Sequence, residues 1–198
     1  MAVLIAEGAG VRLHRRWIVR GLDAVVEPGD LVALTGPPGS GRTSALLALA
    51  GRLKLSAGKL QTGKTQTGTP GAALAHVPGL TDPEPTATVA EHVRERLALL
   101  GRPARGLSGV PLHGLDPDRR GRDLSPHQRH LLGLVLARME DPAAIALDDW
   151  DTGLDDAERA DLLDRLRALT DEGIAVIITA RTVSPSVTTH VITLESEA

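Results

Sequence analysis

The sequence has no cysteine, phenylalanine or tyrosine, and its aromatic content is limited to Trp17 and Trp150. Without cysteine there can be no disulfide, no thiolate metal site and no cysteine redox chemistry. Two tryptophans cannot build the stacking platforms that bind single-stranded nucleic acid, so we expect no nucleic-acid partner. The core must therefore be built from aliphatic residues, and the function must rest on polar groups.

Long apolar runs are also missing. The runs Leu131–Ala137 and Ile174–Ile178 fall far short of the roughly 18 residues that a membrane span needs, and the N-terminus lacks the pattern of a signal peptide. The formal net charge of −3 gives no overall attraction to nucleic acid or to an anionic membrane. We therefore expect a soluble chain, and its 198 residues suit one main domain.

What the sequence does contain is a glycine-rich loop between a predicted strand, Asp30–Thr35, and a predicted helix, Arg42–Ala50. Residues 36–43 match the phosphate-binding P-loop pattern G-x-x-x-x-G-K-[ST] except for arginine in place of lysine. This order of elements turns backbone N–H groups and the positive end of a helix toward one point, which suits a phosphate. The residues predicted to bind nucleotide are Gly36, Pro37, Pro38, Gly39, Ser40, Gly41, Arg42, Thr43 and Ser44.

Two residues of the loop carry its specific chemistry. Thr43 is the predicted Mg²⁺ ligand, because the pattern places a hydroxyl on the metal at this position. Arg42 keeps the positive charge that clamps phosphate oxygens, but a guanidinium is bulkier than an ammonium and donates in a fixed fork. We therefore expect nucleotide binding to survive this replacement better than catalysis. The alternative is a glycine-rich turn that matches the pattern by chance.

The rest of the chain alternates strand and helix patterns. The last two strands are apolar and β-branched, as expected for parallel strands covered on both faces. Predicted strands are Ala2–Ile5, Val11–Leu13, Trp17–Val26, Asp30–Thr35, Gly58–Gln61, Ala72–Val77, Ala143–Leu147, Ile174–Thr179 and Val187–Leu194; predicted helices are Arg42–Ala50, Val89–Leu100, Ser125–Met139 and Asp155–Leu169. Thr62–Thr69 is predicted to be an exposed hairpin or loop.

These elements predict an α/β fold: a P-loop core with a mostly parallel sheet, an antiparallel N-terminal part and a small inserted helical subdomain. We expect residues 1–198 to form a single domain. Its core would comprise residues 1–78 and 140–198, and the helical subdomain residues 79–139, because the composition changes at Pro78-Gly79.

Three more motifs follow the P-loop in order. They are Leu124-Ser125-Pro126-His127-Gln128 at a helix start, Asp148-Asp149 at the end of an apolar strand, and Gly153-Leu154-Asp155. Together the four motifs resemble those of ATP-binding-cassette (ABC) ATPases, in which a Leu-Ser-Gly-Gly-Gln signature, an Asp-Glu strand end and a Gly-Leu-Asp loop occur in the same register. The resemblance covers nearly the whole chain and implies ATP as ligand and Mg²⁺ as cofactor. The alternative for the aspartates is a solvated strand end beside a helix cap.

The resemblance implies a role for each matching residue. Asp148 would bind Mg²⁺, and Asp149 would stand where the family has its catalytic glutamate. Because aspartate is shorter, and a shortfall of about 1 Å can cost roughly a hundredfold in rate, we expect slow hydrolysis. Ser125 and Gln128 would act on the nucleotide of a second subunit, in a homodimer or in a heterodimer with another ABC ATPase.

Several positions depart from the family's pattern. Gly79 stands where a glutamine is expected, Ala180 where a histidine is expected, and Pro126 has no N–H to donate. Arg181 or His127 could supply a missing donor. For adenine, Trp17 is a candidate stacking residue, although an ordinary half-buried hairpin tryptophan fits the sequence equally well.

The resemblance thus implies the ATP-binding subunit of an ABC-type transporter, which hydrolyses ATP slowly to drive or gate a membrane permease. Such a subunit would be cytoplasmic and peripheral on the inner face of the membrane. The alternative is a degenerate nucleotide sensor or assembly partner that binds ATP without turnover, since Gly79, Ala180 and Asp149 all lack the family's side chains. The order of motifs from Ser125 to Asp155 disfavours a third reading, an unrelated P-loop kinase.

Overall fold

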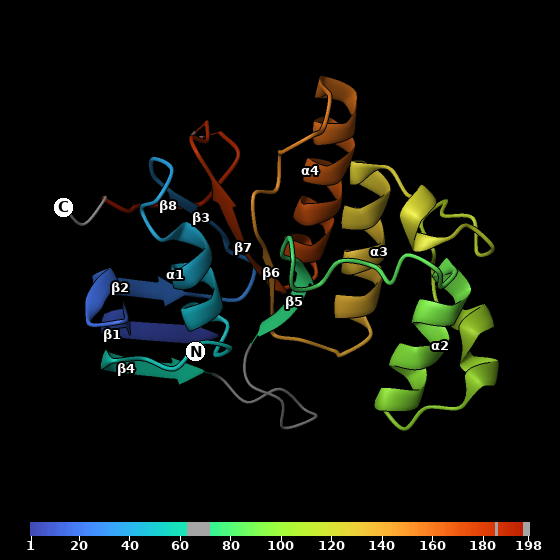
Figure 1. Ribbon diagram of the computed structural model, residues 1–198, viewed down its shortest axis with the longest axis horizontal. Helices are drawn as coiled ribbons and strands as arrows, with labels where there is room; N and C mark the ends of the chain where they lie inside the picture. The colour runs from blue at the N-terminus through green and yellow to red at the C-terminus, as the bar shows by residue number, and fades with distance from the viewer. Residues whose placement is uncertain (63–71, 185, 196–198) are drawn as a thin grey trace.

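The computed structural model describes residues 1–62, 72–184 and 186–195. They form a three-stranded antiparallel sheet of order β2-β1-β4 and a five-stranded parallel sheet of order β5-β6-β7-β3-β8 (Figure 1). The strands are β1 (Leu4–Leu13), β2 (Arg16–Val26), β3 (Leu31–Thr35), β4 (Ala57–Thr62), β5 (Ala72–His76), β6 (Ala144–Leu147), β7 (Ala175–Ala180) and β8 (His190–Thr193). The helices are α1 (Arg42–Leu49), α2 (Val89–Leu99), α3 (Pro126–Arg138) and α4 (Asp156–Asp171), with 3₁₀ helices η1 (Ala104–Gly109) and η2 (Gly121–Asp123).

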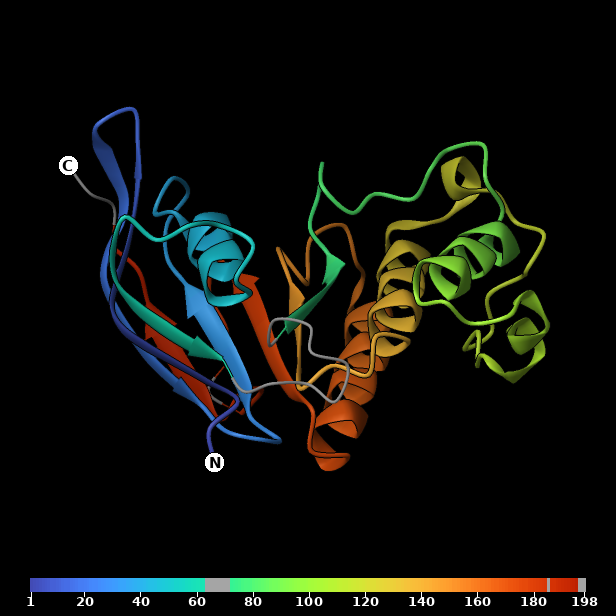
Figure 2. The ribbon, with the colours of Figure 1, turned by 90° about the horizontal axis from the view of Figure 1, so that it is seen from below.

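The elements stack in layers. Helix α1 lies between the two sheets, and α3 and α4 cover the other face of the parallel sheet (Figure 2). Alternation along the strands explains this arrangement, because successive side chains point to opposite faces. In β3, Val32 and Leu34 join the cluster around α1, whereas Ala33 joins the cluster beneath α4. Both faces of β3 are therefore buried.

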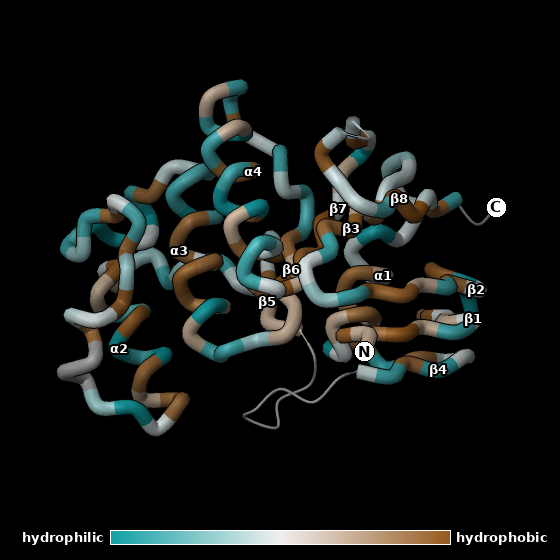
Figure 3. Tube along the Cα trace, turned by 180° about the vertical axis from the view of Figure 1, so that it is seen from behind, coloured by the Kyte–Doolittle hydropathy of each residue, from teal (hydrophilic) through white to brown (hydrophobic). Residues whose placement is uncertain are grey.

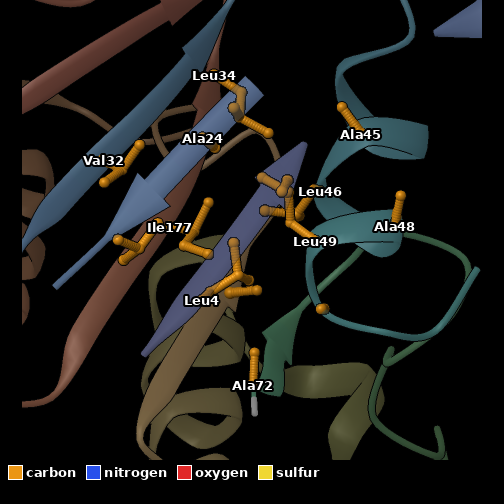
Figure 4. Packing of buried hydrophobic residues seen from close by; sticks show 14 of the residues in the cluster. Leu4, Ala24, Val32, Leu34, Ala45, Leu46, Ala48, Leu49, Ala72 and Ile177 are labelled. Atoms are coloured by element: carbon orange, nitrogen blue, oxygen red, sulfur yellow. The ribbon is translucent and has the colours of Figure 1, made fainter. Parts of the chain in front are cut away.

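Helix α1 is fixed by its apolar face. Leu46 and Leu49 are fully buried and point toward Leu4 of β1 and the neighbouring strands (Figure 4). Each such leucine contributes roughly 1.5–3 kcal/mol by leaving water. Figure 3 colours the chain by hydropathy and shows hydrophobic residues in α1 and in the central strands. This packing fixes the start of α1, where the glycine-rich loop ends.

Two strand predictions need correction. The predicted strands Ala2–Ile5 and Val11–Leu13 are parts of one continuous strand, β1, because irregularities in its pairing accommodate Gly8 and Gly10 without ending the strand. The prediction that the last strand is covered on both faces is wrong. Strand β8 is shorter than predicted and lies at the sheet edge. Among the strands in the described ranges it pairs with β3 alone, and Val191 is 46% exposed.

The segment between β5 and α3 extends to one side of the molecule (Figure 1). It holds α2 as predicted, and it also contains η1 and η2, which the sequence patterns did not indicate. Division into a core and an inserted subdomain at residues 79–139 remains a prediction. From residue 63 on, the predicted loop Thr62–Thr69 lies outside the described residues. No helix within the described ranges is long and apolar enough to cross a membrane.

Candidate functional site

The predicted site lies at the carboxyl ends of three neighbouring strands. Strand β7 pairs in parallel with β3 on one side and with β6 on the other. The glycine-rich loop follows β3, the pair Asp148-Asp149 follows β6, and Thr179 stands near the end of β7. Because parallel strands end at the same edge, segments far apart in sequence meet there, which is the usual place for a ligand in such sheets.

Glycine is required at both ends of the loop. Gly36 has φ 153°, and a Cβ there would lie 2.5 Å from the carbonyl oxygen of Leu194. Gly41 has φ 83°, and a Cβ there would lie 2.4 Å from the carbonyl oxygen of Ile18. The loop is therefore held closely between β2 and the segment after β8. Pro37 and Pro38 have no N–H, so the amides available to an anion begin at Gly39.

Helix α1 begins without the cap that the other helices have. Of the four α-helices in the described part of the chain, α2, α3 and α4 each start with a capping box, in which side chains satisfy backbone N–H groups. Gly41 occupies the N-cap position before α1 and offers no side-chain cap, and the first turn of α1 holds no acidic residue. Its first N–H groups and its positive dipole end are thus left for an anion, as a phosphate site requires. Ser44 lies in this first turn.

Thr43 and Asp148, the two predicted metal ligands, are in contact. The Thr43 hydroxyl donates to Oδ2 of Asp148 over 2.7 Å, and Asp148 is only 4% exposed. The hydroxyl of Thr179 donates to the other oxygen, Oδ1, over 2.6 Å. Both carboxylate oxygens of Asp148 therefore have a hydroxyl partner, one from α1 and one from β7.

These donors fit Mg²⁺. The described residues contain no group of three or more histidine, cysteine or acidic side chains that could hold a metal by themselves. Mg²⁺ commonly needs only one or two protein oxygens together with phosphate oxygens and water. The hydroxyl of Thr43 and the carboxylate of Asp148 form such a partial set, which becomes complete only with a phosphate ligand.

Arg42 and Asp149 form an ion pair across the site. Nη2 of Arg42 lies 3.4 Å from Oδ1 of Asp149, and the two side chains are 15% and 39% exposed. Nη1 of Arg42 is buried and has no hydrogen-bond partner among the described residues, and the same holds for Oγ of Ser40 in the same loop. Burial and the neighbouring carboxylate of Asp148 raise the pKa of Asp149 above its ordinary value, although Arg42 acts in the opposite direction. A raised pKa makes this carboxylate a stronger base.

The signature residues lie at the start of α3. Ser125 accepts a hydrogen bond from the backbone N–H of Gln128, and the Gln128 side chain accepts one from the N–H of Ser125. In this chain they therefore cap their own helix. The ring of His127 forms a hydrogen bond of 2.9 Å with Asp161 of α4, so its side chain points to α4 here.

Trp17 lies on β2, directly before Ile18, which lines the cavity beside the loop. The guanidinium groups of Arg12 and Arg20 lie over its ring, at 5.1 and 5.7 Å. A cavity of about 410 Å³ borders Ser40 and is lined by residues 18–23 and 192–195, a set that does not include Trp17. Stacking of Trp17 on adenine stays a prediction.

Gly79 and Ala180 stand where the family has a glutamine and a histidine. Gly79 has φ 77° in the turn after β5, and its N–H donates to Asp82. Ala180 is fully buried at the end of β7. Neither residue offers a side-chain donor to the site.

Sequence reasoning missed Thr179. Its hydroxyl contacts Asp148 and also accepts the N–H of Asp149 over 2.7 Å. The available signal was a hydroxyl residue near the end of an otherwise apolar strand, next to the position expected to carry a histidine.

A strand, a glycine-rich loop and an uncapped helix facing a buried aspartate together define a P-loop nucleotide-binding protein. A family model described as "ABC transporter" matches residues 19–152, which is more than half of the chain. The chain therefore belongs to the ABC transporter family, as its motifs predicted. Membership in this family implies nucleotide binding.

Similar proteins agree with this assignment. The chain is 34% identical over 177 residues to a Streptomyces coelicolor protein whose name describes it as an ABC transporter ATP-binding protein; the match covers 85% of this chain and 31% of that protein. It is 30% identical over 188 residues to the Nod factor export ATP-binding protein I of Ralstonia nicotianae, covering 89% of this chain and 59% of that protein. The chain thus spans less than two thirds of the length of either relative.

The fold is also found among solved structures. A dimeric bacterial ABC transporter cassette superimposes with a TM-score of 0.78 at 16% identity, covering 98% of this chain and 94% of that one. This likeness confirms the predicted fold class, a P-loop core with a parallel sheet and an antiparallel N-terminal part.

Proposed function

We propose that the chain is the ATP-binding subunit of an ABC-type transporter, and that it binds Mg²⁺-ATP at the P-loop and hydrolyses it slowly to drive or gate a membrane permease. In this role it works on the cytoplasmic side, held at the inner face of the membrane by the permease. The relatives' names, which refer to ABC transport and to Nod factor export, support a transport role without indicating the cargo of this chain.

The observation that carries the proposal is the contact between Thr43 and Asp148, 2.7 Å apart beside an uncapped helix. One residue comes from the start of α1 and the other from the end of β6. A hydroxyl and a carboxylate brought together next to free backbone N–H groups form the setting that a metal-bound triphosphate needs.

The residues divide the work as follows. The N–H groups at the start of α1 bind phosphate oxygens, and Arg42 turns from Asp149 to the β- and γ-phosphates. Thr43 and Asp148 would hold Mg²⁺, which would neutralise phosphate charge when bound. Asp149, freed from Arg42, accepts a proton from the water whose oxygen bonds to the γ-phosphorus, while the bond from that phosphorus to the bridging oxygen breaks and ADP leaves. Its short side chain keeps the rate low.

Assembly with a second cassette is part of the proposal. The bacterial ABC transporter cassette described above was solved as a dimer, and this chain carries a signature-like segment at the start of α3. We propose that Ser125 and Gln128 act on the nucleotide of a partner, either a second copy or another ABC ATPase. Because their side chains now cap α3, contact with a partner's phosphate would require that cap to rearrange.

Calorimetry and phosphate release test the proposal together. The purified chain is titrated with ATP with and without Mg²⁺, and phosphate release is followed in the same buffers. We expect saturable binding that Mg²⁺ strengthens, and slow turnover that Asp148→Asn abolishes. Asp164→Asn on the exposed side of α4 is the matched control and should change neither. No binding at millimolar ATP by folded protein would contradict the proposal.

A second candidate function is a sensor or assembly partner that binds ATP without turnover. The ion pair between Arg42 and Asp149 favours it, because it occupies the only carboxylate positioned as a base in the described site. The absence of side-chain donors at Gly79 and Ala180 points the same way. Tight Mg²⁺-ATP binding with no phosphate release, alone or with a partner cassette, would identify this function.

A further inference from the structure

We infer that Thr179 is a positioning residue for the nucleotide site: its hydroxyl fixes both Asp148 and Asp149, and the strengthening of ATP binding by Mg²⁺ depends on it. This inference rests on the proposed function. It adds a residue that belongs to neither the P-loop nor the aspartate pair.

The hydroxyl of Thr179 connects two consecutive residues of another strand end. It donates its proton to Oδ1 of Asp148 over 2.6 Å and accepts the backbone N–H of Asp149 over 2.7 Å. Thr179 is fully buried, so water cannot replace either bond. One oxygen atom thus sets the rotation of the Asp148 carboxylate and the path of the chain at Asp149.

The backbone at Asp149 needs this support. Its φ is 43°, in the left-handed region that non-glycine residues rarely adopt. Such a conformation persists only where surrounding bonds favour it. The bond from the Asp149 N–H to Thr179 is one such bond, and in this conformation the Asp149 side chain pairs with Arg42.

The carboxylate of Asp148 needs the Thr179 hydroxyl to keep its orientation. One oxygen faces Thr43, the other predicted ligand, and the second oxygen faces Thr179. Partners behind a ligand hold it in its binding orientation, and their removal typically lowers metal affinity by about 10- to 100-fold. Without the Thr179 hydroxyl, Oδ1 would be buried and unpaired, and the carboxylate would be free to rotate away from Thr43.

Isosteric variants separate this role from simple packing. Thr179→Val removes the hydroxyl and keeps the shape, whereas Thr179→Ser keeps the hydroxyl and removes a methyl group. The matched control is Thr189→Val, because the hydroxyl of Thr189 also makes two hydrogen bonds, to the N–H and the carbonyl of Leu31 at the opposite end of β3.

The experiment is calorimetric titration of each variant with ATP, with and without Mg²⁺, alongside thermal unfolding. We expect the factor by which Mg²⁺ increases ATP affinity to be at least tenfold smaller in T179V than in the unmodified chain. The affinity for ATP in the presence of a chelator should change little. T179S should retain most of the gain, and T189V should retain all of it whatever its melting temperature. Should T179V not fold, Thr179→Ala provides the second variant without a hydroxyl.

The outcomes are distinct. If T179V keeps the full Mg²⁺ gain, or loses no more of it than T189V, the positioning role is wrong although the proposed function stands. If T179S loses the gain as completely as T179V, the methyl group and not the hydroxyl matters, and the inference is also wrong. If the unmodified chain binds no ATP, the proposed function itself has failed.

Discussion

Arg42 of the P-loop and Asp149 at the end of β6 are bound to each other, with 3.4 Å between Nη2 and Oδ1. Arginine stands here where the P-loop pattern has lysine, and aspartate stands where the family has its catalytic glutamate. The arginine side chain is longer than lysine and ends in a planar guanidinium, whereas aspartate is shorter than glutamate. The two side chains together therefore still span the site. In the proposed binding mode, an incoming triphosphate competes with Asp149 for Arg42, and that competition would link ATP binding to the availability of the proposed base.

The first prediction concerns Asp149. Asp149→Asn removes a negative charge beside the phosphate site and releases Arg42 from its partner. Because the pair is partly exposed and worth roughly 0.2–1 kcal/mol, we expect ATP to bind up to about fivefold more tightly, while phosphate release stops. Calorimetry and a phosphate assay measure the two effects. Weaker ATP binding by this variant would show that the ion pair does not oppose nucleotide binding.

Arg42 itself gives the second prediction. Arg42→Ala should weaken Mg²⁺-ATP binding by at least tenfold, because the clamp on the phosphates is lost, and Arg42→Lys should restore most of it. Arg52→Ala, in the exposed turn after α1, is the control and should have no effect. Equal affinity of the alanine variant and the unmodified chain would remove Arg42 from the site.

The third prediction compares two glycines of the loop with nearly equal backbone angles. Gly41 and Gly39 have φ 83° and 84°, but a Cβ at Gly41 would meet the carbonyl of Ile18, whereas at Gly39 it would meet nothing within 4 Å. Gly39→Ala should cost about 1 kcal/mol in the free energy of unfolding, from strain alone. Gly41→Ala should cost distinctly more and abolish ATP binding. Urea unfolding of both variants measures the difference, and equal losses would mean that the close approach to β2 is unimportant.

The fourth prediction concerns pH. Burial lowers the pKa of His130 from 6.5 to about 4, with a further contribution from His76, whose ring lies 4.2 Å away. The unfolded chain therefore binds the proton more readily, so stability is complete above pH 6.5 and falls as the pH drops toward 4. At pH 5 the loss from His130 is about 2 kcal/mol.

Urea unfolding at pH 7 and pH 5 tests this. His130→Leu should reduce the difference in stability between the two pH values by about 2 kcal/mol, whatever its effect at pH 7. Gln61→Asn, an exposed substitution that changes no ionisable group, should leave the difference unchanged. An undiminished pH dependence in His130→Leu would assign the acid sensitivity to other groups.

The order of elements could be predicted because local patterns determined it. The loop at residues 36–43, the helix patterns at Ser125–Met139 and Asp155–Leu169 and the apolar strand before Asp148 are all short-range signals, and each lies where the structure has the matching element. Strand β1 was divided wrongly because its glycines resemble turn residues until their pairing with β2 is known. The exposure of β8 depends on its place at the sheet edge, which no local pattern encodes.

The site was predictable as a list of residues but not as a set of contacts. Motif spacing identified Thr43 and Asp148. The hydrogen bond from Thr179 to Asp148 and the ion pair of Arg42 with Asp149, however, form only when β3, β6 and β7 lie side by side. Likewise, nothing in the sequence indicated that His127 would be bound to Asp161, because the two residues belong to different helices. Contacts between segments distant in sequence are what the fold adds.

The central claim is that a triphosphate binds at the uncapped start of α1. The most direct test is a titration of isotope-labelled protein with Mg²⁺-ATP, following backbone amide signals by nuclear magnetic resonance. We predict that the amides of residues 39–44 shift most and saturate together with a single affinity. If no amide in this segment moves at millimolar Mg²⁺-ATP, or if the largest shifts cluster elsewhere, the account is contradicted.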